Sequence, residues 1–363
     1  MARADFTAPA PTLEPTYGPL TPEELALAAR NHAMPAEALR YDVTPVGLHY
    51  LLVHFDIPAI DPAAWRLTIG GRVREPMELT LENLRSRPRR TMAVTMECAG
   101  NGRAAMMPRP LSQPWLAGAV GTAEWTGTPL APLLAESGLD DHAVEVAFLG
   151  ADRGVQGEDE HDYGRSLAVV DAMRPEVLLA YEMNGAPLTP QHGSPLRLVV
   201  PGWYGMTSVK WLTSIEAVAE PFEGWQQAVA YRYTEDADDP GTPVNRIRVR
   251  SMMIPPGIPD FFTRERIVDA GPVTLTGRAW SGNGGIARVE IGVDGQWAIA
   301  KLDPPVGEFA WRGWRAEWTA TPGEHELACR ATDTAGELQP LHPVWNYQGM
   351  GNNAVQRVSV TVR

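Results

Sequence analysis

The sequence contains little cysteine and no long apolar run. Of its 363 residues only Cys98 and Cys329 are cysteines, which excludes a disulfide framework and a zinc site built from several thiolates. No apolar stretch approaches the roughly 18 residues that a membrane-spanning helix needs. Apolar residues make up 44% of the chain, enough for a folded core, and charged residues 21%. The sequence therefore predicts a globular protein without a membrane span, long enough for two domains.

Positive charge is also scarce. Lysine and arginine together number 31 against 44 acidic residues, a net charge of −13, which argues against a broad surface for nucleic acid. Because only Lys210 and Lys301 are lysines, nearly all of the positive charge is guanidinium, which binds oxyanions through paired donors. An anionic ligand would therefore need a local cluster of cations.

The first 22 residues are rich in proline, alanine and threonine and lack periodicity, which predicts an extended N-terminal arm. They contain neither an apolar signal core nor a twin arginine. The sequence as written therefore predicts a cytoplasmic protein, or a periplasmic one if it is a processed form. Thr21-Pro22-Glu23-Glu24 then predicts the start of a short helix, since it offers an N-cap, a proline and acids in the first turn.

Residues 23–245 show short strands and helices without a regular strand–helix–strand alternation, which favours a mixed α+β domain. Strands are predicted at 65–69, 91–96, 144–149, 177–181, 196–200 and 209–218, and helices at 79–84 and 129–137. The charged run 158–162 predicts a solvated loop. Residues 220–259, rich in acids and prolines, predict a connection wrapped over this domain.

The pattern from residue 266 onward is almost entirely strand. Asp294-Gly295, between alternating residues, indicates a two-residue hairpin turn. Cys329 falls in an alternating strand, which predicts a core position. A segment of about a hundred residues with this pattern favours an immunoglobulin-like β-sandwich, which we expect to span residues 246–363.

The most informative segment surrounds Cys98. An apolar strand ends there, and a Gly/Asn loop follows whose backbone can approach a ligand closely. Arg103, five residues later, could lower the pKa of the thiol and hold an anion. A thiolate without a second cysteine nearby could be a nucleophile, or a single soft ligand to a metal otherwise held by a cofactor.

Here the sequence resembles the sulfite oxidase family of molybdopterin-dependent oxidoreductases, in its bacterial, haem-free form. The run Cys98-Ala99-Gly100-Asn101 with Arg103 resembles the family's molybdenum–cysteine loop, and other motifs follow in the family's order over roughly residues 28–363. These are Arg30-Asn31-His32, Tyr181-Glu182-Met183-Asn184-Gly185, His192-Gly193-Ser194-Pro195-Leu196-Arg197, Ser208-Val209-Lys210-Trp211, Trp280-Ser281-Gly282 and Pro343-Val344-Trp345-Asn346.

The resemblance implies a molybdopterin-binding catalytic domain over residues 23–245, a molybdenum–molybdopterin cofactor and a C-terminal dimerisation domain, hence a homodimer. It implies that Cys98 binds the metal. It also implies that the pterin and its phosphate are held by Asn31, His32, Asp152, His192, Arg197, Ser208, Val209 and Lys210. Arg197 and Lys210 would supply charge to the phosphate, and the backbone around Ser208 could donate hydrogen bonds to it.

On the substrate side, the resemblance implies that Arg30, Arg103 and Trp115 line the pocket. It also implies an active-site tyrosine shortly after Trp225-Gln226, and we favour Tyr231 over Tyr233. Two differences from the family matter. Gly102 replaces one arginine of the cysteine loop, and no arginine closely follows Trp280-Ser281-Gly282, where the family usually has a third substrate arginine. Two cations would bind a dianion more weakly than three.

The favoured function is oxygen-atom transfer to a small oxyanion, sulfite to sulfate. No Cys-x-x-Cys-His motif is present, so we expect no haem in this chain and a separate electron acceptor such as a cytochrome, if not oxygen. The alternatives on the same scaffold are nitrate reduction and oxidation of a sulfane-type sulfur compound. Those from other classes are a cofactor-free immunoglobulin-like binding protein and a cysteine-dependent hydrolase.

Overall fold

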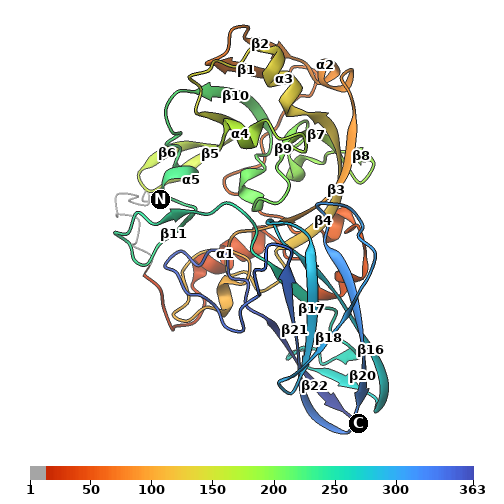
Figure 1. The fold of residues 1–363 in the computed structure, drawn as a ribbon. Helices are drawn as coiled ribbons and strands as arrows, with labels where there is room; N and C mark the ends of the chain where they lie inside the picture. Colours follow the sequence, from red (N-terminus) through yellow and green to blue (C-terminus); the bar gives the residue numbers. More distant parts are fainter. Residues whose placement is uncertain (1–13) are drawn as a thin grey trace.

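The computed structural model describes residues 14–363, so residues 1–13 of the predicted arm lie outside the described residues. Figure 1 shows an upper part built around two sheets and a lower part, coloured blue and cyan, that is a β-sandwich. This arrangement confirms the predicted α+β class with an immunoglobulin-like C-terminal domain. Among the described residues, no helix has the length and apolar character needed to cross a membrane.

The helices are short. The first, α1 (Pro22–Arg30), begins as predicted: the Thr21 hydroxyl accepts from the Glu24 N–H and the Glu24 carboxylate accepts from the Thr21 N–H, so both ends of this capping box are satisfied. A buried ion pair between Glu24 and Arg109 fixes the helix. The other helices are α2 (Leu81–Arg85), α3 (Leu130–Glu136), α4 (Val169–Ala172) and α5 (Trp225–Ala228), with 3-10 turns η1 (Ala36–Arg40), η2 (Val46–Leu48), η3 (Arg103–Ala105), η4 (Pro190–His192) and η5 (Gly205–Thr207).

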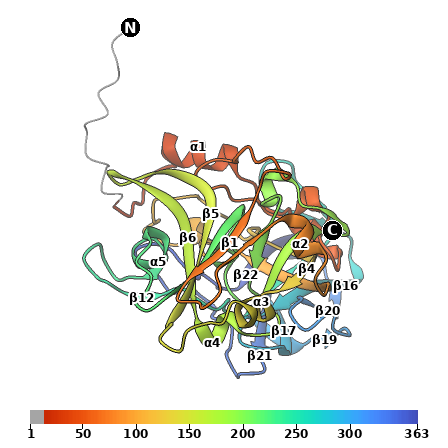
Figure 2. The same ribbon diagram turned by 90° about the horizontal axis from the view of Figure 1, so that it is seen from above.

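The upper part contains two sheets. The first has the order β2-β1-β10-β5-β6, in which β1 and β10 run parallel and the other neighbours antiparallel; Figure 2 shows β5 and β6 side by side. The second has the order β3-β4-β7-β8, with β9 paired to β7. Apolar side chains from both sheets, α2 and α3 share one core. The strands are β1 (Leu67–Gly71), β2 (Met77–Leu79), β3 (Arg90–Glu97), β4 (Val120–Pro129), β5 (Glu145–Gln156), β6 (Asp159–Ala168), β7 (Leu178–Met183), β8 (Ala186–Pro187), β9 (Arg197–Val199) and β10 (Leu212–Val218).

Four strands of this part were not predicted, the short β2 and β8 and the longer β4 and β6. The loop expected at 158–162 is wrong, because Asp159–Asp162 belong to β6 and pair with Arg153–Gln156 of β5. Here the two strands extend beyond the sheet as a ribbon, and most of its side chains are exposed, so no apolar alternation marks it. Strand β4 is rich in glycine and threonine and is buried on both faces, which also removes the alternation.

The lower part is a sandwich of two sheets with the orders β13-β16-β20-β19 and β14-β15-β22-β21-β17-β18. Cys329 is fully buried in its core, as predicted. The Asp294-Gly295 turn joins β17 to β18, and both residues have positive φ, 50° and 81°, as a two-residue hairpin requires. The strands are β13 (Arg250–Met253), β14 (Ile258–Pro259), β15 (Arg266–Val268), β16 (Gly271–Trp280), β17 (Ile286–Val293), β18 (Gln296–Ile299), β19 (Lys301–Leu302), β20 (Arg312–Ala320), β21 (Gly323–Asp333) and β22 (Gln356–Val362).

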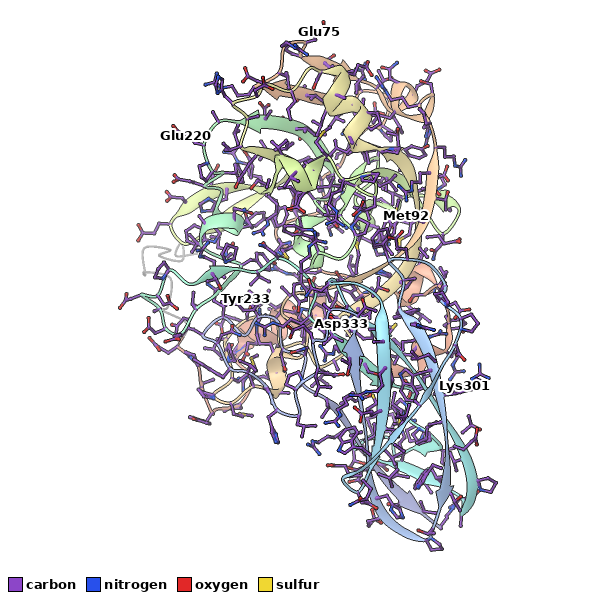
Figure 3. All side chains as sticks on the ribbon, in the orientation of Figure 1. Glu75, Met92, Glu220, Tyr233, Lys301 and Asp333 are labelled. Carbon is purple, nitrogen blue, oxygen red and sulfur yellow. The ribbon has the colours of Figure 1, made fainter. Side chains whose placement is uncertain are left out.

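The two parts are packed together through a shared core. Residues 219–249 connect them and include the small hairpin β11 (Arg232–Tyr233) and β12 (Thr242–Pro243). One apolar cluster combines Tyr204 and Tyr231 with Trp280 and Trp311 of the lower part. In Figure 3 the side chains of Tyr233 and Asp333 lie near this junction, between Glu75 at the upper end and Lys301 on the sandwich. The junction therefore contains ordered structure from both parts of the chain.

Candidate active site

Cys98 lies directly after β3, at the junction of the two parts. Its N–H donates to the Ala119 carbonyl, and its own carbonyl accepts from the Asn101 N–H, which closes a tight turn. Burial raises the pKa of the Cys98 thiol, and the nearby Arg103 guanidinium opposes this rise. Without a bound cation the thiol is therefore protonated at neutral pH, which favours the metal-ligand interpretation over a free nucleophile.

Two hollows meet at Cys98. We call them the inner cleft and the outer cavity, and both are lined by Leu52, His54, Cys98 and Tyr231. The inner cleft is also lined by five of the predicted cofactor residues, Asp152, His192, Arg197, Ser208 and Lys210. The outer cavity, of about 640 Å³, is also lined by the predicted substrate residues Arg30, Arg103 and Trp115. The structure thus brings most of the predicted site residues to one place.

The inner cleft holds two cations without an anionic partner. The Arg197 guanidinium donates to the carbonyls of His192 and Ser208 and lies 4.7 Å from the centre of the Trp125 ring. The Lys210 ammonium donates to the carbonyls of Leu52 and Gln191. Within residues 14–363 neither side chain forms an ion pair. Burial lowers the pKa of Arg197 to about 10 and that of Lys210 to about 7, so an anion between them would be strongly favoured.

Of the other titratable groups of the inner cleft, His49 and His192 are neutral at neutral pH, and Asp152 is mostly ionised. Burial lowers the pKa of His49 to about 4 and, with His49 and Arg197 adding to the effect, that of His192 to about 2. Burial raises the pKa of Asp152 to about 6, and the Asp152 Oδ1 atom is buried without a hydrogen-bond partner in the described chain. An unsatisfied carboxylate oxygen in a cleft indicates a ligand that donates hydrogen bonds.

The predicted backbone donors around Ser208 are not free. The Ser208 N–H donates to the Gly205 carbonyl and the Val209 N–H to the Thr207 carbonyl. The Val209 side chain is fully buried in the core of the upper part and does not line the cleft. Ser208 Oγ accepts from the Val200 N–H, which leaves its hydroxyl proton available as a donor to a ligand.

Asn31 and His32 are not where the sequence placed them, because they line neither hollow. All Asn31 amide groups bond to the protein: Nδ2 donates to the Leu27 carbonyl and to Gln113 Oε1, and Oδ1 accepts from the Val53 N–H. His32 is exposed, and its backbone pairs antiparallel with Leu51. Asn31 and His32 therefore hold the segment 49–54 in place through hydrogen bonds. The imidazoles that line the site are those of His49 and His54.

Arg103 is the buried cation of the outer cavity. Its Nε donates to the Gln348 carbonyl, its Nη1 to the Gln113 carbonyl, and its Nη2 lies 3.4 Å from the Met350 sulfur. A Cβ atom on Gly100 would lie 2.7 Å from Arg103 Nη2, so the guanidinium needs glycine there. Arg103 forms no ion pair within the described chain, which leaves its charge available to a ligand.

Arg30 and Trp115 also line the outer cavity, one exposed at its rim and the other buried. Arg30 ends α1 at the rim, is exposed, and donates to the His54 carbonyl. Trp115 is 3% exposed, and its indole lies close enough to Cys98 to lower the pKa of the thiol, although its Nε1 forms no hydrogen bond of ordinary geometry within residues 14–363. A buried indole N–H that faces a cavity is a donor available to a ligand.

Tyr231 lies at the junction of the two hollows, whereas Tyr233 lines neither and packs on Arg248. The Tyr231 hydroxyl is 2.5 Å from His54 Nε2. Burial lowers the pKa of His54 to about 3 and raises that of Tyr231, so the bond joins a neutral imidazole to a neutral phenol. The geometry therefore favours Tyr231 as the tyrosine of the site.

The segment that follows Trp280 does not reach the outer cavity. Ser281 and Gly282 line a different cavity, with Arg174, Arg246 and Arg312. The C-terminal segment that reaches the outer cavity is instead Gln348–Met350, whose Gln348 carbonyl and Met350 sulfur contact Arg103. This segment contributes no cation. A third arginine does line the outer cavity, Arg153, but it pairs with Glu160 and Asp162.

Several lining residues were missed by sequence reasoning. His49 and His54 stand five positions apart in a mostly apolar run. These histidines could have been singled out in the sequence, but the histidine of the motif was placed at residues 30–32 instead. Gln226 was noted only as a landmark, although it is 1% exposed and lines the outer cavity. Tyr50, Met96, Tyr163 and Met206 also line the inner cleft, although nothing in the sequence marks them as site residues.

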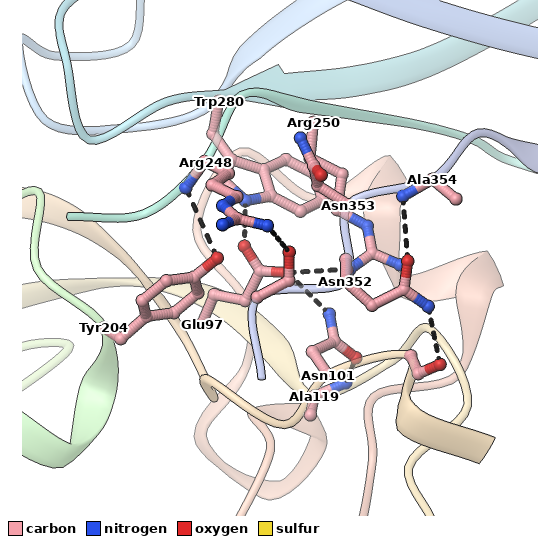
Figure 4. A network of polar contacts seen from close by, with 12 residues as sticks. Glu97, Asn101, Ala119, Tyr204, Arg248, Arg250, Trp280, Asn352, Asn353 and Ala354 are labelled. Atoms are coloured by element: carbon pink, nitrogen blue, oxygen red, sulfur yellow. Dashed lines mark hydrogen bonds and ion pairs between the residues drawn. The ribbon is translucent and has the colours of Figure 1, made fainter. Parts of the chain in front are cut away.

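Behind the cysteine loop, Glu97 is the centre of a buried polar network (Figure 4). Its carboxylate accepts from Asn101 Nδ2 at 2.8 Å, Arg250 Nη1 at 2.9 Å and Trp280 Nε1 at 2.7 Å. Arg250 also donates to the Asn352 carbonyl. Because Arg250 and Trp280 belong to the sandwich sheet and Glu97 precedes Cys98, the lower part of the molecule holds the cysteine loop in place.

Comparison with known proteins identifies the family. Residues 54–226 match the oxidoreductase molybdopterin-binding domain, and residues 242–363 match the Mo-co oxidoreductase dimerisation domain. Sulfite oxidase of Gallus gallus is 34% identical over 350 residues, which cover 90% of this chain and 75% of that protein. Mitochondrial sulfite oxidase of Homo sapiens is 35% identical and is covered over 62% of its length, so the chain spans less than two thirds of that relative.

Two other similar proteins are named for other reactions. An NADH nitrate reductase of Solanum lycopersicum is 32% identical, with 88% of this chain and 38% of that protein covered. The crystal structure of the sulfane dehydrogenase SoxCD from Paracoccus pantotrophus superposes with a TM-score of 0.79 at 26% identity, covering 99% of this chain and 96% of that chain. The molybdopterin domain match begins at His54, which leaves residues 30–32 outside it. The dimerisation domain indicates a homodimer, and the binding domain a molybdenum–molybdopterin cofactor. This chain belongs to the sulfite oxidase family of molybdopterin-dependent oxidoreductases.

Proposed function

We propose that this enzyme oxidises sulfite to sulfate and passes the electrons to an external acceptor such as a cytochrome. The observation that carries the proposal is the position of Arg103, a buried guanidinium without a carboxylate partner, in the cavity that opens onto Cys98. A preorganised cation beside the reacting centre attracts an oxyanion and stabilises the charge that shifts during its oxidation.

The polar groups of the inner cleft suit the cofactor. Its unpaired cations, Arg197 and Lys210, suit a phosphate dianion, and the unsatisfied Asp152 oxygen suits the N–H groups of a pterin ring. The Cys98 thiol at the junction suits a single soft ligand to molybdenum. When bound, the cofactor supplies the exchangeable oxygen atom and accepts two electrons.

The residues of this chain bind and orient the substrate. Arg103 and, at the rim, Arg30 bind the oxyanion, and the Trp115 N–H donates to one of its oxygens. The Tyr231 hydroxyl, held by His54, lies where the outer cavity meets the inner cleft and orients the ion toward Cys98. The low pKa of His54 keeps this pair neutral, so it adds no charge that would repel the substrate or compete with it.

A second candidate reaction is the oxidation of a sulfane-type sulfur compound. The absence of a cation in segment Gln348–Met350 supports it, as does the likeness to the sulfane dehydrogenase over nearly the whole chain. Nitrate reduction is a third reaction on the same scaffold. The family assignment favours all three over a cofactor-free binding protein or a hydrolase.

The test is a steady-state assay on holoenzyme of measured molybdenum content. We expect sulfite-dependent reduction of ferricyanide and of a cytochrome, with two equivalents of acceptor per sulfate formed. The matched comparison is the reduction of nitrate by a reduced dye in the absence of oxygen, in which the substrate loses an oxygen atom instead of gaining one. Nitrate turnover without sulfite turnover in fully loaded enzyme would contradict the proposal.

A further inference from the structure

The outer cavity is much larger than sulfite. Its volume is about 640 Å³. Even at the ~30 Å³ that a water molecule occupies in the liquid, the four heavy atoms of sulfite need only about 120 Å³. Most of the cavity would therefore hold water when sulfite is bound beside Cys98, which leaves room for a substituent on the sulfur atom.

Part of the lining of this cavity, which we call the apolar wall, consists of hydrophobic side chains. Leu27, Leu52, Phe55, Leu111 and Met350 line it, and they come from α1, the segment before β1, the loop before β4 and the C-terminal segment. An ion as polar as sulfite gains nothing from such a wall. A carbon substituent would gain about fourfold in affinity for each methylene removed from water.

The charge in the cavity matches one negative charge rather than two. Arg103 is 4% exposed and has no ion-pair partner in the described chain. Of the other charged residues that line the cavity, Arg30 and Asp56 are exposed, and Arg153 pairs with Glu160 and Asp162 on the ribbon of β5 and β6. The buried charge that faces a bound ligand is therefore a single guanidinium.

The Gln226 side chain supplies a second polar contact. It is 1% exposed and lines the outer cavity, and neither its Oε1 nor its Nε2 has a hydrogen-bond partner in residues 14–363. Its backbone carbonyl accepts from Arg165, a buried residue of β6, which anchors α5 in place. A buried amide without partners is costly, and a ligand oxygen that accepts from Nε2 removes part of that cost.

We propose that the enzyme oxidises organic sulfinates, with Gln226 as a specificity-determining residue beside Arg103. A sulfinate carries one negative charge, which matches Arg103, and two oxygens that accept hydrogen bonds, one of them from Gln226. Its sulfur lone pair would face the junction at Cys98, and its carbon substituent would contact the apolar wall. The proposal rests on the proposed oxygen-atom transfer. The sulfur gains one oxygen atom from water and becomes a sulfonate. Two electrons pass to an external one-electron acceptor, and two protons are released.

The activity test compares sulfite, methanesulfinate and benzenesulfinate as substrates of molybdenum-loaded enzyme with ferricyanide, and identifies the sulfonate product by mass spectrometry. We expect benzenesulfinate to have the lower KM of the two sulfinates, by tenfold or more, because its ring is buried. Turnover of sulfite with sulfinates below one hundredth of its kcat/KM would overturn this inference and leave the proposed function standing. Turnover of sulfinates without sulfite would support it and overturn sulfite as the substrate, and inactivity toward all three would overturn both.

A binding measurement tests Gln226 independently of turnover. Benzenesulfonate, which cannot be oxidised further at sulfur, is titrated calorimetrically into the oxidised holoenzyme. We expect Gln226→Leu to weaken its binding tenfold or more, while Gln227→Leu on the same helix, which does not line the cavity, leaves it unchanged. Gln226→Glu, which keeps the size of the side chain and adds a charge, should weaken binding at least as much. Equal binding by wild type and a folded Gln226 variant would refute the role of this residue.

Discussion

The buried pair between Glu97 and Arg250 provides the sharpest test of how the two parts of the molecule cooperate. The side chains are 3% and 5% exposed, and the Nη1–Oε1 distance is 2.9 Å. Arg250→Met would leave the Glu97 carboxylate buried without its cation. Removing one partner of such a pair typically costs about 3–5 kcal/mol of unfolding free energy. Because Asn101 and Trp280 still donate to the carboxylate, we expect a loss near the lower end, about 3 kcal/mol.

The assay is urea unfolding followed by tryptophan fluorescence, with molybdenum content measured on the same samples. Glu97→Gln combined with Arg250→Met removes the unpaired charge, so the double variant should be more stable than Arg250→Met alone by about 1–2 kcal/mol. Arg288→Met is the matched control, since this half-exposed arginine forms a surface pair with Glu290 and should lose less than about 1 kcal/mol. We also expect Arg250→Met to lower molybdenum content, because Cys98 follows Glu97 directly. A loss below about 1 kcal/mol, or a double variant no more stable than the single one, would refute the reasoning.

Three further predictions concern the site itself. Cys98→Ser should lower sulfite oxidation by more than about a hundredfold and remove the protein sulfur from the molybdenum X-ray absorption spectrum, and full activity in loaded protein would contradict the ligand role. Gly100→Ala would place a Cβ 2.7 Å from the Arg103 guanidinium, so the KM for sulfite should rise about tenfold or more; Gly47→Ala, whose Cβ would meet nothing within 4 Å, should not change it. Burial lowers the pKa of Lys210 to about 7 in the cofactor-free protein, and an anion requires the charged form. The affinity of cofactor-free protein for sulfate, measured by calorimetry, should therefore be constant below pH 7 and fall by up to about tenfold per pH unit above it. Lys210→Met should remove that pH dependence. An unchanged slope in this variant would assign the titration to another group.

Local patterns in the sequence predicted much of the fold. The Thr21 capping box, the Asp294-Gly295 turn and the buried Cys329 were predicted because neighbouring residues alone determine them. Strand β6 was missed because its first half is exposed on a ribbon, where no apolar alternation is required. Sequence patterns therefore succeeded where burial on one face was regular and failed where a strand had no such face.

The candidate site was predictable to a smaller extent. Cys98, Arg103 and Lys210 were found because their residue types are rare in this chain or stand in a distinctive loop. The imidazole was assigned to His32, although the chain at 30–32 pairs antiparallel with the segment that ends at His54, and it is this segment that lines the site. A short motif in the sequence does not reveal which of two adjacent segments faces the ligand.

The roles of Gln226 and Glu97 depend on contacts that only the tertiary structure creates. Gln226 has importance only because its amide is buried without partners, and Glu97 meets Arg250 across 153 positions of sequence. Neither relation leaves a local pattern, so both required the structure.

The contact of Gln348 and Met350 with Arg103 has a consequence for how this enzyme can be dissected. The region recognised as a molybdopterin-binding domain ends at residue 226, more than a hundred positions before Gln348, whose carbonyl accepts from Arg103. A fragment that stopped there would lose this contact and that of Met350, so Arg103 would be released from one side. We therefore expect that no fragment of the chain can reproduce the outer cavity, and that the two domains have to be produced together.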